Sequence, residues 1–524
     1  MYLEWLVIAC ILALIVRLLR NLWWRPLQIY KDLRAQGLMG PPFIPIVGNL
    51  VELNRLLAEA PSTWIMKNPS NEIVPYILPY YTAWSKIYGE TFVYCVGSQV
   101  RVTITDPELI KEVLNNKFGH CPKLEPTTAA RDLLGDGLLT ATGEKWAEQR
   151  RILNHGFDVD KLKVMVERIA DLATKMLDDW SRRIIEANQP KDLEIEVLKE
   201  YQILTADIIA HTAFGTSYEA GKTVFKLQQR QFAILLEAMR PPRLQLKSLA
   251  SFYCSFLPLA INPHRQKIRK AIEDNLQQLV QKRIKLESQN DLQQNDLLGV
   301  MICAYNGKLR GNQKNLRMSI QDIVDECKTF FLAGQETTAA FLTWTTMLLA
   351  LHPDWQERLR AEVINVCGSR HPSYSMLNQL KLVGMVLNEV LRLYPGSPHM
   401  MRGIDRDMKL GKIVIPKGTV VSLLPLVTMH NKQIWGEDAD EFNPERFAEG
   451  IANASKHRSA FMPFSLGPRN CIGQVFALME AKVVLCKLLQ RFSFQLSPAY
   501  VHAPGRFSVP KPEHGMQILV KPYN

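Results

Sequence analysis

The stretch "FMPFSLGPRNCIGQVFALMEAK" (461–482) places one cysteine, Cys471, between a turn-forming segment and a long apolar pattern. Gly467 and Pro468 are turn residues, and the residues after Gly473 are largely apolar. A cysteine in this setting fills a core, forms a disulfide, acts as a nucleophile or binds a metal. What the chain does depends on which of these four roles Cys471 has.

The composition is that of an ordinary globular protein. The 524 residues are 47% hydrophobic and 22% charged. The nine cysteines are an odd number and form no CxxC pair. We therefore expect neither a disulfide framework nor a zinc site, and we expect a reducing compartment.

Residues 1–25 predict a transmembrane anchor. The apolar run from Trp5 to Val16 is shorter than the roughly 20 residues that span a bilayer. Three following leucines extend the run to Trp23 and Trp24, which are typical of a membrane interface. A cleaved secretory signal is the alternative. Glu4 before the run and the lack of a small-residue cleavage site after it favour an uncleaved anchor.

The residues after the anchor predict its orientation and a hinge. Arginines and lysines follow the apolar run, so the positive-inside rule places the rest of the chain in the cytosol. Residues 26–50 include "GLMGPPFIPIVGN" (37–49), whose prolines cannot continue a helix. We interpret this Pro/Gly-rich segment as a stiff hinge, with residues 51–524 as the body of the protein.

The net charge of +12 favours an anionic lipid surface beside the protein, with an acidic redox partner as the second interpretation. Nucleic acid is disfavoured, because the sequence has no zinc finger, no RNA-recognition signature and no basic run with interleaved aromatic residues.

Helical periodicity dominates the rest of the chain. The segments with apolar residues at three- and four-residue spacing are 160–187, 193–214, 263–287, 319–351 and 376–394. Shorter strand-like runs occur at 92–104, where Gly-Ser predicts a hairpin, at 413–424, and in "GMQILVKP" (515–522). We predict a mainly α fold with small peripheral β-sheets.

The segment 319–351 predicts the longest helix, roughly 50 Å at 1.5 Å per residue. Ser319 and Asp322 predict a capping box at its start. Its middle, "AGQETT" (333–338), places a glycine, an acid and two threonines inside an apolar stretch. A solvent-facing polar patch is one interpretation. A functional interruption of the helix is the one we favour, because burying Glu336 is expensive without a purpose.

The pattern F-x-x-G-x-R-x-C-x-G is present at Phe464, Gly467, Arg469, Cys471 and Gly473. It resembles the haem-binding loop of the cytochrome P-450 family. The resemblance implies the P-450 fold and a haem b whose iron has Cys471 as its axial thiolate, a ligand type that favours O–O cleavage. It also implies that Arg469 pairs with a haem propionate and that Phe464 packs beside the sulfur.

The thiolate explains the remaining residue types of the loop. Gly467 and Gly473 allow the chain to wrap closely around the sulfur, so that backbone N–H groups bond to it. A helix that begins after Cys471 directs its positive end at the sulfur, so we expect a lowered thiol pKa.

Other motifs agree with the resemblance. Glu389 and Arg392 of "EVLR", with Arg446 of "PERF", match the buried charge cluster of the family, which is structural. Trp146 and Arg150 of "WAEQR" lie four apart, and both are hydrogen-bond donors only.

The resemblance implies that Trp146 and Arg150 hold haem carboxylates, with Arg402 as a further candidate. The family places "AGQETT" over the distal face of the haem, with a loosened turn at Ala333 and Gly334. Glu336 and Thr337 then relay protons while dioxygen is activated.

Thr337 favours a monooxygenase over two alternatives. A haem-thiolate isomerase or dehydratase that works without a reductase is the second enzyme class. A haem sensor or carrier is the non-enzymatic alternative. The resemblance further implies an endoplasmic reticulum protein that receives electrons from NADPH through a flavoprotein reductase. Four basic residues near the thiolate loop are candidates to meet that partner or are simply solvated: Lys456, Arg458, Lys482 and Lys487.

The substrate is the least determined feature. "ATGEKWAEQRRILNHGFDVDKLK" (141–163) resembles plant members of the family that hydroxylate hormones, terpenoids and fatty acids. By family position the substrate cavity draws on 121–139, 205–250, Phe330, Phe331, Ala333, 396–401 and 505–509. These segments are rich in apolar residues, so we expect a lipophilic substrate: an isoprenoid-derived hormone, a steroid, another terpenoid or a fatty acid.

Overall fold

Helices form most of this computed structural model, which describes residues 2–60, 70–186, 193–215, 218–239, 263–289, 296–309, 316–506 and 509–523. The predicted mainly α fold is confirmed. The N-terminal half contains α1 (Tyr2–Leu19), η1 (Arg20–Trp24), α2 (Arg25–Ala35), α3 (Leu50–Glu59), α4 (Val74–Ile77), α5 (Pro79–Tyr88), α6 (Pro107–Asn115), α7 (Thr128–Leu134), α8 (Gly143–Asn154), η2 (His155–Phe157), α9 (Val159–Glu186), α10 (Val197–Phe214) and α11 (Tyr218–Met239). The C-terminal half contains α13 (Pro263–Gln289), α14 (Leu297–Tyr305), α15 (Ile320–Leu351), α16 (Pro353–Cys367), α17 (Tyr374–Leu377), α18 (Lys381–Leu393), α19 (Pro425–Met429), α20 (Lys432–Trp435), η4 (Pro444–Phe447), η5 (Ile451–Asn453) and α21 (Gln474–Arg491).

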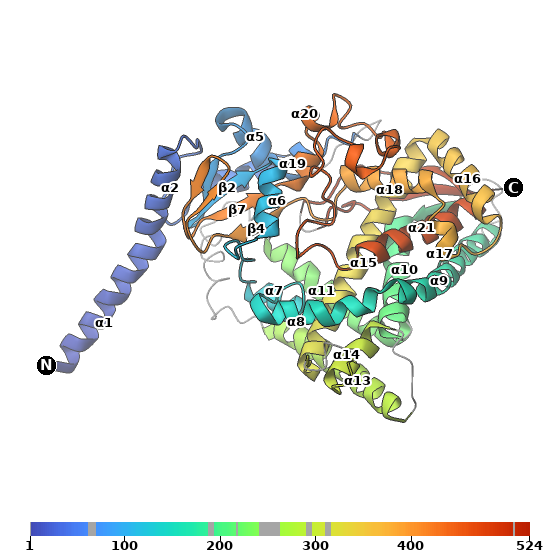
Figure 1. Cartoon of the computed structure of the whole chain (residues 1–524), viewed down its shortest axis with the longest axis horizontal. Coiled ribbons are helices and arrows are strands. Elements are labelled where there is room, and N and C mark those ends of the chain that lie inside the picture. Colours follow the sequence, from blue (N-terminus) through green and yellow to red (C-terminus); the bar gives the residue numbers. More distant parts are fainter. Residues whose placement is uncertain are drawn as a thin grey trace.

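The long helix α15 runs through the middle of the molecule (Figure 1). Ser319 and Asp322 form the predicted capping box, and Pro353 begins the next helix. The helix is continuous, and every residue from Ile323 to Leu349 is buried except Ala333, Gly334 and Thr337. Burial on almost all sides explains why its sequence is apolar around its whole circumference.

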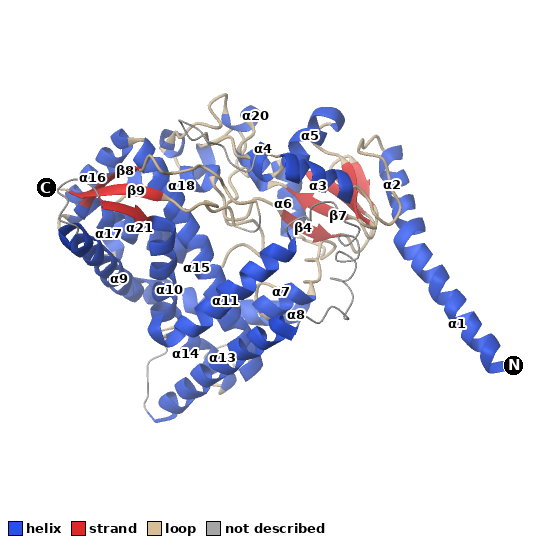
Figure 2. Cartoon of the chain, turned by 180° about the vertical axis from the view of Figure 1, so that it is seen from behind, coloured by secondary structure: helices blue, strands red, loops and turns tan. Residues whose placement is uncertain are grey.

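Small sheets lie at two ends of the molecule (Figure 2). One has the order β1-β2-β7-β4, from β1 (Val93–Val96), β2 (Gln99–Ile104), β4 (Met400–Gly403) and β7 (Val420–Leu423). The second has the order β3-β9-β8, from β3 (Leu193–Glu196), β8 (Phe492–Leu496) and β9 (Gln517–Pro522). β5 (Met408–Leu410) pairs with β6 (Ile413–Ile415). The predicted hairpin at 92–104 is confirmed, because Val96 pairs with Gln99 across Gly97-Ser98.

Two predicted helices differ from the structure at their ends. The segment 193–214 begins as strand β3, because residues 193–196 pair with β9 from the C-terminus. Glu196 then caps α10 by accepting from the Leu198 and Lys199 amides. The segment 376–394 is split into α17 and α18, and the Glu362 carboxylate accepts from the first amides of α18. A contact from outside each segment therefore sets each boundary.

The N-terminal helix projects away from the body (Figure 1). α1, the π-helical turn η1 and α2 follow without a break, and Tyr2–Ala35 is long and apolar enough to cross a membrane. α1 buries no residue, whereas α2 buries Ile29, Tyr30 and Leu33 among others. The first ten residues of the expected hinge, 26–35, are thus helical and packed on the body.

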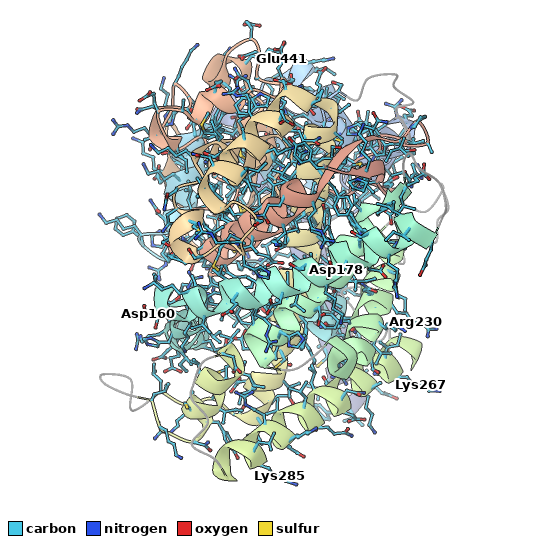
Figure 3. All side chains as sticks on the ribbon, turned by 90° about the vertical axis from the view of Figure 1, so that its right-hand side faces the viewer. Asp160, Asp178, Arg230, Lys267, Lys285 and Glu441 are labelled. Atoms are coloured by element: carbon cyan, nitrogen blue, oxygen red, sulfur yellow. The ribbon has the colours of Figure 1, made fainter. Side chains whose placement is uncertain are left out.

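The helix α9 shows how the outer helices of the body are built. Figure 3 shows it crossing the molecule from Asp160 to Asp178, with α13 below it, labelled at Lys267 and Lys285. Its inner face buries Leu162, Ile169 and Leu177, and its charged residues face outward. This arrangement gives the period of 3.6 residues from which the helix was predicted.

Candidate functional site

The cysteine loop folds as a tight turn before α21. The Cys471 amide donates to the Phe464 carbonyl at 2.9 Å, and the Asn470 amide donates to the Gly467 carbonyl at 3.1 Å. The Cys471 sulfur accepts a hydrogen bond from the Gly473 amide. Gly473 is the N-cap of α21, so the predicted placement of a helix N-terminus at the sulfur is confirmed. The Phe464 ring is partly buried against the main core.

The two glycines of the loop have different roles. Gly467 has a φ of +74°, and a Cβ added there would lie 2.5 Å from the Leu114 carbonyl oxygen at the end of α6. Gly473 has an ordinary φ of −89°, and its added Cβ would meet nothing closer than a Phe157 carbon at 3.8 Å. Gly467 therefore lets the loop approach α6, whereas Gly473 supplies an amide.

The Cys471 side chain is accessible and yet largely surrounded by protein. Accessibility taken alone describes a surface residue. Nevertheless burial raises its pKa, and this outweighs the lowering by the Gly473 amide and by Arg150. Both observations hold if the sulfur opens onto a space that protein surrounds. The expectation that the polypeptide itself lowers this pKa is wrong, although a bound metal deprotonates a thiol directly.

The two residues of the "WAEQR" motif lie at different parts of the loop. The Arg150 guanidinium donates to the Asn470 carbonyl at 2.8 Å and to the Asn470 side-chain oxygen at 3.1 Å. The Arg469 guanidinium lies over the Trp146 ring, 4.3 Å from the centroid of that ring. Arg150 thus braces the cysteine loop, while Trp146 and Arg469 come together one helical turn away.

Three cations lie close to one another: Arg469, which contacts Trp146, together with Arg402 and Lys123. Burial, followed by Arg402, lowers the pKa of Arg469 to about 10. Burial, followed by Arg402 and Arg469, lowers the pKa of Lys123 to about 7. Among the described residues, no carboxylate lies within ion-pair distance of any of the three. An anionic group relieves such mutual repulsion, and a haem carries two such groups in its propionates.

No sequence motif assigned Lys123, or the loop before Ala141 that contacts Arg469, to the haem carboxylates. Arg469 donates to the Ala141 carbonyl at 3.0 Å. The loop before Ala141 is attached to α15, because the Leu138 amide donates to the fully buried Glu326 carboxylate at 2.9 Å. Burial raises the pKa of Glu326 to about 8. Neither Lys123 nor Glu326 lies in a recognisable pattern, so only their burial identifies them.

The residues in the middle of α15, 333–337, lie in different surroundings. Ala333 and Thr337 are accessible inside an otherwise buried helix, so they adjoin an open space. Gly334 packs against α10, where an added Cβ would lie 3.0 Å from Ile209. Thr337 donates to the Ala333 carbonyl at 2.6 Å, as expected for a threonine that bonds back to its own helix. The helix is not interrupted at 333–334, and Gly334 serves close helix packing instead.

Glu336, the buried acid of this segment, is paired. Its carboxylate accepts from the Lys511 ammonium at 2.6 Å, and its side chain is only 5% exposed. Lys511 comes from a loop near the C-terminus, 175 residues away in sequence. The sequence did not indicate this partner.

The predicted structural charge cluster is present. Arg392 donates to both oxygens of Glu389, at 2.7 and 2.8 Å, and Arg446 reaches the same carboxylate at 3.4 Å. Glu389 and Arg392 are fully buried. His430, to which the sequence assigned no role, joins Asp440 to the Leu393 carbonyl in the same region.

Only some of the residues predicted to line the substrate cavity have accessible surface. Phe331 is fully buried and stacks on Phe214 at 4.3 Å, so it belongs to the core, because aromatic neighbours enclose its ring. Phe330 is also buried, next to Phe157. Ala333 and His399 retain accessible surface. Residues 216–217, 240–250 and 507–508 of the expected lining lie outside the described residues.

The candidate partner-binding cations fall into two pairs. Lys487 is buried, so its charge is not available at the surface. Lys482 is partly exposed, and its ammonium donates to the Leu377 carbonyl at 2.8 Å. Lys456 and Arg458 are exposed.

The chain matches the family model described as Cytochrome P450 over residues 39–519. It is 41% identical to cytochrome P450 734A1 of Arabidopsis thaliana, over 98% of this chain and 96% of the relative. It is 38% identical to secologanin synthase 2 of Catharanthus roseus, also over 98% and 96%. The accessible thiol on its glycine-bounded loop, the cations beside it and these similarities agree: the chain belongs to the cytochrome P450 family and is a haem-thiolate oxidoreductase.

Proposed function

We propose that this protein is a membrane-anchored monooxygenase that hydroxylates a lipophilic substrate with electrons from an NADPH-dependent flavoprotein reductase. Residues 1–25 anchor it in the endoplasmic reticulum membrane, and residues 51–524 form its cytosolic haem domain. The family supplies the haem-thiolate iron and the oxidoreductase chemistry. The proposal adds the roles of particular residues, the electron donor, the location and the substrate class.

The observation that carries the proposal is the middle of α15. Thr337 presents a hydroxyl to an open space, and the neighbouring Glu336 is a buried, ion-paired acid. A monooxygenase must deliver protons while dioxygen is activated, and these two groups are suited to that task. An isomerase or a sensor has no such requirement.

Each remaining site residue has a role that its surroundings support. Cys471 would hold the haem iron through its thiolate, a ligand that would supply electron density favouring O–O cleavage. The Gly473 amide hydrogen-bonds the sulfur. Arg402, Arg469 and Lys123, with Trp146, hold the propionates. Arg150 keeps the cysteine loop in place through Asn470.

The substrate class rests on apolar side chains and on the relatives. Relatives at 38–41% identity carry different names, one of them for secologanin synthesis, so similarity does not single out a substrate. Spectral titration with steroids, gibberellins, cytokinins and fatty acids, followed by product identification, tests this part of the proposal.

Two surface features support the electron donor and the location. The helix Tyr2–Ala35 is long and apolar enough to span a membrane. Lys456 and Arg458 present exposed positive charge near the cysteine loop, which suits an acidic reductase.

The substitution Thr337→Ala tests the reaction class. We expect product formation to fall roughly tenfold or more, because positioned proton transfer contributes about a hundredfold or more. NADPH consumption should continue and release peroxide. The measurement is product and peroxide formed per NADPH by reductase-coupled protein, whose red-shifted Soret band under carbon monoxide verifies thiolate ligation.

Thr343→Ala is the matched control. Thr343 makes the same bond back to its helix, to the Ala339 carbonyl at 2.7 Å, but it is fully buried. It should leave the product yield per NADPH unchanged. Equal yields from the wild type and Thr337→Ala would favour an isomerase, and a missing Soret shift in haem-loaded protein would contradict the assignment of Cys471.

A further inference from the structure

Lys511 lies in one of two paired segments near the C-terminus, residues 503–505 and 511–513, which we call the C-terminal hairpin. The Gly505 amide donates to the Lys511 carbonyl at 2.7 Å, and the Glu513 amide donates to the Ala503 carbonyl at 2.8 Å. These bonds pair residues 503–505 with residues 511–513 in antiparallel orientation, so backbone contacts define the position of the Lys511 Cα.

A second contact fixes this hairpin on α15. The Trp344 indole donates to the Pro510 carbonyl at 2.8 Å, and Trp344 itself is fully buried. Trp344 lies about 12 Å along the helix from Glu336 at 1.5 Å per residue. The hairpin thus contacts α15 at two points, one an indole N–H and the other the Lys511–Glu336 ion pair.

Lys511 and Glu336 differ in their access to water. The Glu336 side chain is 5% exposed and the Lys511 side chain is 28% exposed. The ammonium also lies over the Phe232 ring of α11, 5.8 Å from its centroid. An ammonium has three protons to donate, and the bond to Glu336 uses one. Lys511 therefore extends from water-accessible surface to a carboxylate that water reaches poorly.

A buried carboxylate without a partner becomes protonated, because desolvation disfavours its charged form. An opposite charge at 2.6 Å reverses that preference. Glu336 is adjacent in sequence to Thr337, whose hydroxyl borders the open space. Glu336 can accept and pass a proton beside Thr337 only while its carboxylate is ionised and oriented. The partner that keeps the carboxylate in that state therefore matters for proton transfer.

We propose that Lys511 is a positioning residue for proton delivery, which holds the Glu336 carboxylate ionised beside Thr337 and links that carboxylate to the C-terminal hairpin. This inference rests on the proposed monooxygenase function. It assigns to the hairpin a part in the reaction in addition to any contact with substrate.

The spectroscopic test does not depend on turnover. Infrared difference spectra are recorded between the wild type and E336Q, and between K511M and the double variant K511M/E336Q. We expect the first difference to contain a carboxylate band and the second a protonated carboxylic acid band. A carboxylate band in both differences would overturn the proposal, because Glu336 would then be ionised without Lys511.

The functional test is a double-mutant cycle on product formed per NADPH. We expect K511M to lower this ratio roughly five- to tenfold, within the hundredfold or more that positioned proton transfer contributes. K511R should restore most of it, since it keeps the charge. K511M should have little further effect in the E336Q background. Lys521, an exposed lysine on β9, supplies the control variant K521M, which should match the wild type.

A purely structural ion pair predicts a different pattern. In that case K511M lowers the thermal midpoint and speeds hydrogen exchange at the Gly505 and Glu513 amides, but product per NADPH stays at the wild-type ratio. That result overturns the proposal. Failure of the proposed function is recognised separately, because T337A and E336Q would then not change the ratio either.

Discussion

The ion pair of Glu389 and Arg392 allows a test of how much one buried interaction contributes to stability. Their side chains are fully buried, and Arg392 also donates to the Met429 carbonyl at 2.8 Å. Arg392→Met leaves the Glu389 charge without its bidentate partner. Removing one member of a buried pair costs about 3–5 kcal/mol, so we expect a loss of that size in the free energy of unfolding. Urea denaturation of the haem-loaded full chain measures it.

An exposed pair supplies the comparison. Lys163 and Asp160 are 2.9 Å apart, with side chains 52% and 93% exposed. Such surface pairs contribute about 1 kcal/mol or less, so Lys163→Met should have little effect. If Arg392→Met shifts the urea midpoint no more than Lys163→Met does, the cluster is not a determinant of stability.

At the scale of elements, the cysteine loop and α21 depend on Gly467 more than on Gly473. Gly467→Ala places a Cβ 2.5 Å from the Leu114 carbonyl oxygen at a positive φ, which alone costs about 1–2 kcal/mol. We expect this variant to displace the loop from α6 and to retain less haem. The haem-to-protein ratio and the thermal midpoint measure both effects.

Gly473→Ala is the matched variant in the same loop. Its φ is ordinary, its Cβ has room, and its amide can still reach the Cys471 sulfur. It should retain haem and stability close to the wild type. Equal losses from the two alanines would show that space around the sulfur, and not the approach to α6, requires the glycines.

In the molecule as a whole, the N-terminal helix has two parts that differ in how they contact the body. α1 buries nothing, so removal of residues 2–24 should release the protein from membranes and leave its thermal midpoint unchanged. Removal of residues 2–36 also takes Ile29, Tyr30 and Leu33 out of the core. Each such side chain contributes roughly 1.5–3 kcal/mol, so the second truncation should lower the midpoint clearly.

Membrane fractionation and thermal unfolding of the two truncated chains check this prediction. A chain lacking residues 2–24 that still sediments with membranes would indicate a second attachment in the body. Equal midpoints for the two truncations would show that α2 adds nothing to the stability of the body.

Much of the fold was predictable because its signals are local. The capping box at Ser319 and Asp322, the hairpin around Gly97-Ser98 and the apolar face of α9 each involve neighbours a few residues apart. The errors occurred where a distant segment intervened. β9 turns the start of the segment 193–214 into a strand, and Ile209 explains a glycine at position 334 that the sequence suggested was an interruption.

The sequence by itself determined the family, the cysteine loop, the helix that carries Glu336 and Thr337, and an N-terminal helix apolar enough to cross a membrane. Each of these is encoded in one continuous stretch whose spacing is set by chain geometry. The tertiary structure alone decided that Lys123 joins Arg402 and Arg469, and that Lys511 reaches Glu336 across 175 residues. Such pairings carry no sequence signal, because burial and charge bring them together only after the helices and sheets have packed.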